Sequence, residues 1–534
     1  MRKSAVTILI ASVICTASFA QGVNRTVQVD NDYVSELAGV QKQGVSMSVP
    51  DSLLHFDYKF DYSVFETPFK GAYEFSPYSI HVQPDASVYD GSSFWFKAGA
   101  GFTMHPVLQF VAAPVVRNDR VVSIYNDGSG FWGRYAGNGL SRYGDASLFN
   151  GWDFSDRLGF EGRWRLRKLE FGADARYDVI GAGDKFSDTN STTHALNVGL
   201  SFKPVVPVKV LYDIRGNIGV LEGIGRNVIP AKGFNASLAG TIGKEMGEGR
   251  LMGDVLVAMD QLVFDRADGS VTNLFPLYSL TPHYDFSFGI AEIRAGVRLD
   301  YTDHFTVAPD VRVSANVLDD RLNLFAGAGG GQSLTDYLTL RSGYHMALTE
   351  GCVNGVSYER VNVYAGFDSY IGHTFQYGLK AGYRNFGSTP SETLTGYVFN
   401  SIEMGYATAK FALKTERIDF DGNLNYTATR SLDGLAYFAA PMFSGDARFV
   451  YNWNRRIYAG VWAQGQTSRR GHVGTQRADL PAFVNLGVSG EFKVSQKFGF
   501  WVEGGNLLGM DLWRNPVCAE TDPYFTAGIC LKFQ

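Results

Sequence analysis

The sequence predicts an all-β protein, a transmembrane, antiparallel, up-and-down β-barrel of about 20–22 strands preceded by an extended N-terminal arm. First, apolar and polar residues alternate along many segments of roughly ten residues, which gives each strand one apolar and one polar face. Second, short breaks join these segments into pairs, and longer Gly-, Ser- and Asp-rich stretches lie between the pairs. Third, the chain begins with the pattern of an export signal.

Composition favours a barrel over other membrane proteins. The chain has 534 residues, including 61 glycines, 39 phenylalanines and 28 tyrosines, and its mean hydropathy is −0.08. A value near zero fits a lipid-facing surface balanced by a polar lumen, and no run of about 18 apolar residues follows the N-terminus. The formal charge of −5 and the lack of a basic, aromatic-rich patch exclude nucleic acid as a partner. A large soluble all-β protein is the alternative.

Residues 1–20 are expected to form a cleaved signal peptide. Arg2 and Lys3 precede the apolar run 5–14, and Ser18 and Ala20 are small residues at the −3 and −1 positions of a cleavage site. Cleavage is therefore expected before Gln21. A cysteine in the leader suggests a lipoprotein as the alternative, although the isoleucine before it is larger than a lipidation site requires. Export together with barrel strands predicts the cell outer membrane of a Gram-negative bacterium.

Residues 21–90 are expected to form the extended arm, in the periplasm or in the lumen. This stretch is polar, contains four prolines and has few alternating runs. Such a composition is typical of irregular chain and not of a folded domain.

Residues 91–534 are expected to form the barrel. The predicted strands are 94–102, 107–116, 153–166, 169–179, 196–202, 208–218, 234–242, 251–263, 284–288, 293–301, 311–317 and its return strand after 321, 361–370, 374–384, 403–413, 418–427, 443–451, 457–466, 482–494, 498–503 and 524–533. The predicted long loops are 126–150, 182–192, 332–354, 387–395 and 469–480.

The direction of the first strand follows from the turn at residues 103–106. Short turns of outer-membrane barrels face the periplasm, so this turn would make strand 94–102 run toward the periplasm. The arm, for example at residues 72–82, would then have to add a strand or thread the lumen before the barrel begins.

The last strands show the alternation most clearly. Even positions of 482–494, such as Leu486, are apolar, whereas odd positions such as Asn485 are small or polar. In the final strand the odd positions are apolar and the last of them is Phe533. The apolar set is predicted to face lipid.

Residues 498–533 resemble the end of TonB-dependent outer-membrane receptors, especially those of Bacteroidota. The shared features are an Asn506-Leu507-Leu508 element carried by the penultimate strand, Trp513 in the following loop and a final strand that ends in Phe533. Gly509 and Gln534 depart from the family's pattern. The resemblance implies that Phe533 is an insertion signal read by the barrel-insertion machinery.

The arm resembles the leader of a plugless group of such receptors. The motif at residues 24–29, the motif at 32–34 and Pro50-Asp51 carry this likeness, and the arm is too short for the folded plug of full receptors. The resemblance implies porin-like passage of a solute or ligand across the outer membrane. The alternative is a non-conducting structural barrel that scaffolds an outer-membrane complex. The expected partners are outer-membrane lipid, the insertion machinery and surface lipoproteins.

The polar strand faces supply candidates for a solute path. The predicted lumen-lining residues are Arg163, Arg165, Glu170, Asp174, Arg176, Arg294, Arg298, Asp300 and Arg312. The alternative is that these charges simply pair across strands, as in any polar barrel interior.

No enzyme, cofactor or metal site is predicted. The nine histidines lack metal-ligand spacing, and no Ser/His/acid arrangement is indicated. The glycine run 327–331 lacks a phosphate-loop lysine and is expected to bend the wall. Cys352 and Cys518 fall in predicted outer loops and are candidates for a disulfide, with two free thiols as the alternative.

Overall fold

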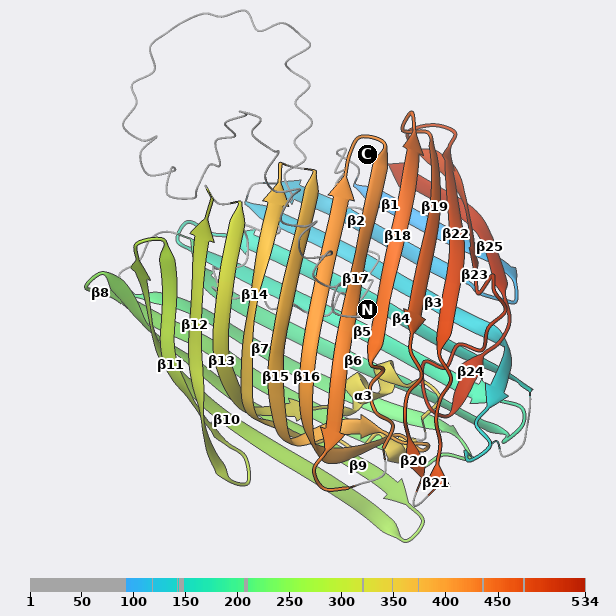
Figure 1. Cartoon of the computed structure of the whole chain (residues 1–534), viewed down its shortest axis with the longest axis horizontal. Coiled ribbons are helices and arrows are strands. Elements are labelled where there is room, and N and C mark those ends of the chain that lie inside the picture. Colours follow the sequence, from blue (N-terminus) through green and yellow to red (C-terminus); the bar gives the residue numbers. More distant parts are fainter. Residues whose placement is uncertain are drawn as a thin grey trace, which may run out of the picture. The chain divides into compact units, whose positions relative to one another are not determined.

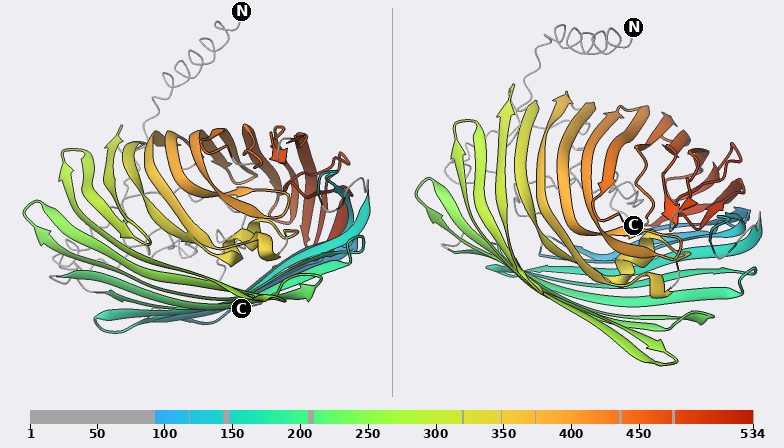
Figure 2. Two further views of the ribbon diagram at one scale, coloured as in Figure 1. Left: turned by 90° about the horizontal axis from the view of Figure 1, so that it is seen from below. Right: turned by 60° about the horizontal axis from the view of Figure 1, so that its bottom comes forward.

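Alternation of side chains along the strands produces a closed antiparallel barrel, as predicted. The structure, a computed structural model, describes residues 93–533 except residues 118, 142, 144–147, 206–209, 319–320, 348, 373, 435–436 and 474–475. In this part of the chain, 22 strands form a single ring (Figures 1 and 2). The predicted signal peptide and arm lie outside the described residues.

The ring is built in chain order. Its strands are β1 (Phe94–Phe102), β2 (Val107–Arg117), β3 (Arg120–Gly137), β4 (Phe149–Arg165), β5 (Leu169–Asp184), β6 (Thr189–Pro204), β7 (Leu211–Arg226), β8 (Ala231–Met246), β9 (Gly249–Arg266), β10 (Gly269–Phe288), β11 (Ala291–Tyr301), β12 (Phe305–Val317), β13 (Leu322–Thr335), β14 (Gly355–Ile371), β15 (Phe375–Glu392), β16 (Tyr397–Lys414), β17 (Ile418–Ser431), β18 (Phe443–Trp453), β19 (Ile457–Gln466), β22 (Phe483–Lys493), β23 (Phe498–Gly505) and β25 (Tyr524–Phe533).

The connections hold the remaining elements. These are the helix α3 (Tyr337–Gly343), the 3₁₀ turn η5 (Thr349–Gly351), the hairpin of β20 (His472–Val473) and β21 (Gln476–Arg477), and the short strand β24 (Cys518–Glu520), which pairs with β3. The described part of the chain contains no helix that is long and apolar enough to cross a membrane.

The last strand closes the ring on the first. β25 pairs antiparallel with β1, from Phe94 opposite Phe533 to Phe102 opposite Phe525. The rings of Phe94 and Phe533 also touch, with centroids 5.9 Å apart. No edge strand is left open in the ring, which removes the unpaired backbone groups that lipid could not satisfy.

The faces of the strands are as predicted. On β22, Val484 and Val488 are exposed on the outer surface, whereas Asn485 points inward and is only 1% exposed. Aromatic side chains stack on the outer surface of β3 and β4, where Trp132 lies beside Trp152 and Phe154. An apolar outer surface with aromatic residues toward the strand ends is typical of a lipid-facing wall.

The connections divide into two ends. The long ones follow β3, β13, β17, β19 and β23, and they all lie at the same end, which we name the outer mouth. The opposite end has only short connections, and it also holds the start of β1 and the end of β25. Short connections face the periplasm in outer-membrane barrels.

The prediction for the start of the barrel was wrong. Residues 126–137 belong to β3 and not to a loop, so the connection 103–106 lies at the outer mouth. β1 therefore begins at the short-turn end, and the arm has no need to cross the barrel first. The physical reason is crowding, because a Cβ on Gly128 would lie 2.5 Å from Asp156 Oδ1 and one on Gly130 would lie 2.5 Å from the Trp132 ring. These glycines make room for large neighbours, although they resemble turn residues.

Two other predicted loops are largely strand. β5 continues to Asp184 and β6 begins at Thr189, and β15 continues to Glu392. The predicted loops 332–354 and 469–480 do correspond to long connections at the outer mouth.

The glycine run 327–331 bends the wall as expected. The register of β13 against β14 shifts between Gly329 and Gly331, and Gly331 has φ +127°. A Cβ on Gly331 would lie 2.5 Å from Asp300 Oδ2. This bulge comes just before the chain leaves the wall for α3.

Candidate functional site

Residues 336–354, which we name the inner segment, fold back into the ring instead of projecting outward. Thr335 and Gly355 are direct register partners, so the segment leaves β13 and returns to the neighbouring β14 at one point. The Asp336 side chain caps α3 by accepting a hydrogen bond from Thr339 N at 2.8 Å. Both views in Figure 2 show α3 enclosed by the ring of strands.

Polar contacts hold the inner segment against the wall formed by β4, β6 and β9. Arg341 donates hydrogen bonds to Ser191 Oγ on β6 and to Ala347 O within the segment. Asn354 Nδ2 donates to Asp260 Oδ2 on β9 at 2.7 Å.

Two further contacts extend this attachment. The hydroxyls of Tyr337 and Thr193 are 3.5 Å apart, and His345 Nδ1 lies 3.8 Å from Asp153 Oδ1 on β4. Together these contacts reach almost half-way around the ring from β14.

Apolar packing supports the same arrangement. The buried cluster around the inner segment contains Phe131, Tyr135, Tyr143, Phe149, Ile180, Ala182, Ala195, Leu221, Ala231, Leu262, Phe264, Tyr337, Leu338, Leu340, Tyr344, Met346, Ala347, Cys352, Val517 and Cys518. These residues come from the inner faces of β3–β9, from the inner segment and from the connections after β3 and β23. The outer mouth therefore contains a folded core.

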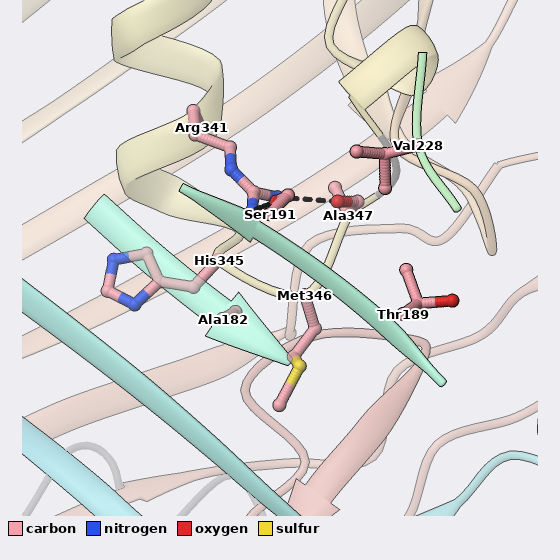
Figure 3. A pocket seen from close by; sticks show the side chains of 8 residues that line it. All are labelled: Ala182, Thr189, Ser191, Val228, Arg341, His345, Met346 and Ala347. Atoms are coloured by element: carbon pink, nitrogen blue, oxygen red, sulfur yellow. Dashed lines mark hydrogen bonds between the residues drawn. The ribbon is translucent and has the colours of Figure 1, made fainter. Parts of the chain in front are cut away.

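A small pocket lies where the inner segment meets β5, β6 and the connection after β7 (Figure 3). It has an empty volume of about 190 Å³, including space open to solvent, and Thr189, Ser191, Arg341 and His345 provide its polar lining. The Arg341 side chain is 1% exposed, and among the described residues its Nε has no hydrogen-bond partner. Thus a buried guanidinium borders the pocket, and its hydrogen-bond partners in the described part of the chain are two neutral oxygens.

Burial controls the titration of the groups beside Arg341. It raises the pKa of the Cys352 thiol to about 11, with the Arg341 charge acting in the opposite direction. Burial likewise raises the pKa of the Tyr337 hydroxyl. Both groups are therefore neutral over the physiological pH range.

The connections after β17, β19 and β23 pack against one another. Arg469, which is 5% exposed, forms an ion pair with Glu392 at the end of β15, with Nη2 and Oε2 2.7 Å apart. A second buried cluster joins the connections after β17, β19 and β23; its members are Ala136, Phe438, Ala478, Leu480, Phe483, Leu512, Trp513 and Ala519.

Charges anchor the connection after β23. Arg514 Nη1 and Glu520 Oε1 are 2.9 Å apart, and Arg134 binds Asp522 through Nε and Nη2 at 2.8 and 2.6 Å. Burial raises the pKa of Glu520, and the Arg514 charge opposes this rise.

The predicted lumen residues on β4 and β5 enter separate ion-pair groups. Glu170 lies 2.9 Å from Lys203 Nζ and 3.6 Å from Arg165 Nη2. Arg176 Nε lies 2.7 Å from Asp178, which also binds Arg157 at 2.8 Å. Arg163 and Asp174 share the inward face of their strands with these groups.

The predicted lumen residues on β11 and β12 form a second set. Arg294 binds Asp285 at 2.9 Å, and Arg298 binds Asp300 at 3.0 Å. Asp300 Oδ2 also accepts the backbone N–H of Gln332 at 2.6 Å, which ties β11 to the bulge of β13.

Arg312 differs from the other predicted residues. It is the register partner of Arg294 on the next strand, and none of the described carboxylates pairs with it. The nine predicted residues therefore lie on one inner surface, but the structure does not bring them together into one binding site.

The sequence alone does not indicate four residues of this site, which are Arg341, Ser191, His345 and Asp260. The available signal was the apolar content of residues 337–346, which is unusual for an exposed loop. Among the described residues, no cluster of His, Cys, Asp and Glu could hold a metal ion.

The two cysteines of the predicted disulfide are both buried. Cys352 and Cys518 lie in the same buried cluster. Cys352 has a free thiol in this structure. The disulfide with Cys518 stays a prediction.

Comparisons with known proteins agree with the fold. No protein-family model matches the chain, and a search of curated proteins finds no significant match. Solved structures do match. The iron transporter of Neisseria meningitidis is 11% identical with a TM-score of 0.61, covering 82% of this chain and 81% of its own.

Two further structures give the same result. The ferric-catecholate import receptor of E. coli K12 is 8% identical with a TM-score of 0.61, covering 83% of this chain and 82% of its own. A variant of the ferric enterobactin receptor of Pseudomonas aeruginosa is 10% identical with a TM-score of 0.58, covering 82% and 80%. This chain thus shares its barrel fold with bacterial proteins that bind or import iron complexes.

Proposed function

We propose that this protein is an outer-membrane barrel through which a solute or ligand passes. The observation that carries the proposal is a closed ring of 22 strands with an apolar outer surface and a charged inner surface. A ring of this size is too wide for wall side chains alone to fill. The barrels that it resembles in fold belong to receptors and transporters of iron complexes.

The inner surface suits polar solutes. Arg165, Glu170, Arg294 and Asp300 all lie on this surface in ion pairs. Paired charges keep the wall hydrated without a large net charge, which is compatible with passage of either charge sign. The polar lining also follows from the alternative that the charges serve only to stabilise the wall.

A second candidate function is a non-conducting scaffold for surface lipoproteins. The folded core at the outer mouth favours it, because Tyr337, Leu338 and Leu340 fill space that an open pore would leave to water. A rigid outer surface of this kind is suited to a fixed partner.

Liposome swelling distinguishes the two functions. The mature chain and a variant without residues 21–90 would be reconstituted and exposed to small sugars. We expect swelling that increases when the arm is removed, since we propose that the arm partly fills the lumen. Two impermeable barrels, together with a lipoprotein that co-purifies in fixed ratio from native membranes, would favour the scaffold.

A further inference from the structure

We infer that the inner segment is a fixed constriction that sets the largest solute able to pass the outer mouth, and that Arg341 positions it. This inference rests on the proposed passage of a solute. It concerns residues 336–354, which join two neighbouring strands.

The path of the inner segment requires it to obstruct the mouth. Its ends meet at Thr335 and Gly355, so a two-residue turn would be enough to connect them. Instead the segment reaches Ser191 on β6 and approaches Asp153 on β4. A chain that leaves one wall, contacts the far wall and returns must occupy part of the opening (Figure 2).

The inner segment also contacts the wall on its own side. The rings of Tyr344 and Tyr397 on β16 pack edge to face, with centroids 6.1 Å apart. A Cβ on Gly343 would lie 2.9 Å from the Tyr397 hydroxyl. The segment is therefore wedged between β16 and the wall of β4, β6 and β9. Segments with many buried contacts open rarely, so this one acts as a fixed obstacle.

Arg341 connects the inner segment to the far wall. Its guanidinium donates outward to Ser191 Oγ and back to Ala347 O (Figure 3). The planar fork of arginine supports two such bonds at once, whereas the single ammonium of lysine does not reproduce the geometry. Arg341→Lys keeps the charge and loses the fork, so it tests positioning separately from charge.

The experiment removes the inner segment from the full mature chain. Residues 336–354 would be replaced by Asn-Gly, which closes a hairpin between Thr335 and Gly355. The matched control replaces residues 472–477 by Asn-Gly. Its ends also meet, since Ala478 N donates to Gly471 O at 2.9 Å. A heat-modifiable shift on a detergent gel verifies that each barrel has folded.

Swelling of liposomes with sugars of increasing size is the readout. We expect the inner-segment deletion to admit larger sugars, Arg341→Lys to raise the limit by a smaller amount, and the control to match the wild type. An unchanged limit in a folded deletion variant would overturn the constriction while leaving passage intact. A raised limit in the deletion but not in Arg341→Lys would overturn the positioning role. Wild-type and deletion barrels that are both impermeable would overturn the constriction and the proposed passage together.

Discussion

The direction of a single side chain decides its environment in this wall. Leu486 lies on the outer face of β22, and Ser489 lies on the inner face opposite Glu503. Asn485, the inward neighbour of Leu486, is buried and accepts the backbone N–H of Asn506 at 2.8 Å. Ser489 is therefore a better control for an inward substitution than Asn485.

We expect Leu486→Arg to reduce assembly much more than Ser489→Arg. A guanidinium at mid-membrane on the lipid face costs about 2–4 kcal/mol, whereas an arginine at 489 would face Glu503 in water. The amount of heat-modifiable protein in outer-membrane fractions measures the difference. Equal amounts of the two variants would contradict the assignment of faces.

Cys352 is expected to resist alkylation in the folded barrel. With its pKa raised to about 11 by burial, only about a thousandth of the thiol is ionised at pH 8. Raising the pH toward 11 increases the thiolate fraction and should speed the reaction. Mass spectrometry after iodoacetamide treatment, with Cys352→Ser as the control, follows the label.

The same experiment tests the predicted disulfide. Labelling of Cys352 in denaturant without a reductant would show a free thiol. Labelling that appears only after reduction would show that Cys352 is in a disulfide, and loss of this dependence in Cys518→Ser would identify Cys518 as its partner.

At the scale of elements, the bulge of β13 connects the wall to the inner segment. Arg298 and Asp300 on β11 bind the backbone of Gln332, directly after Gly331. The bulge turns the end of β13 just before Asp336 begins the capped helix. A predicted pair of lumen charges thus has a structural role.

We expect Gly331→Ala to destabilise the barrel by about 1–3 kcal/mol, because alanine disfavours the positive φ and its Cβ would crowd Asp300 and Arg298. The matched control is Gly329→Ala, where the nearest atom to the added Cβ is Pro309 O at 3.8 Å. The midpoint temperature of the heat-modifiable gel shift compares the two variants. Equal midpoints would show that the bulge tolerates a side chain.

Strands were predictable where one face is uniformly apolar, as on β22 and β25. β3 was missed because residues 126–130 consist of small and polar types that also form turns. Only the folded wall reveals that Gly128 accommodates Asp156 of the neighbouring β4 and that Gly130 accommodates Trp132 of β3 itself.

The site was less predictable than the wall. Arg341 and Ser191 are 150 residues apart in sequence, and no local pattern connects them. The inward fold of residues 336–354 depends on tertiary contacts with β4, β6 and β9. Periodicity identified the inner face, but it could not identify which part of that face the segment covers.

At the scale of the whole barrel, closure depends on β1 and β25. Phe533 pairs with Phe94 at the short-turn end, and Phe525 pairs with Phe102 at the other end of the same two strands. Both phenylalanines of β25 face outward. They therefore form a matched pair at opposite ends of one strand, and only Phe533 is predicted to act as an insertion signal.

We expect Phe533→Ala to lower the amount of assembled barrel several-fold, and Phe525→Ala to have a smaller effect. Both changes remove one outward aromatic, but only the first removes the proposed insertion signal. Quantification of heat-modifiable protein in outer membranes, relative to unfolded protein in the periplasm, provides the measurement. A larger loss for Phe525→Ala would argue against the insertion role of Phe533.

The pairing of β1 with β25 has a consequence for biogenesis. β25, the partner of the first strand, leaves the ribosome after every other strand of the ring. Until β25 arrives, the backbone N–H and C=O groups along one side of β1 have no hydrogen-bond partner and must be shielded from other chains. A chain that terminates before β25 leaves β1 and its own last strand as unpaired edge strands. Closing a narrower ring would require β1 to pair with a different strand. We therefore expect such a product to be degraded by periplasmic proteases.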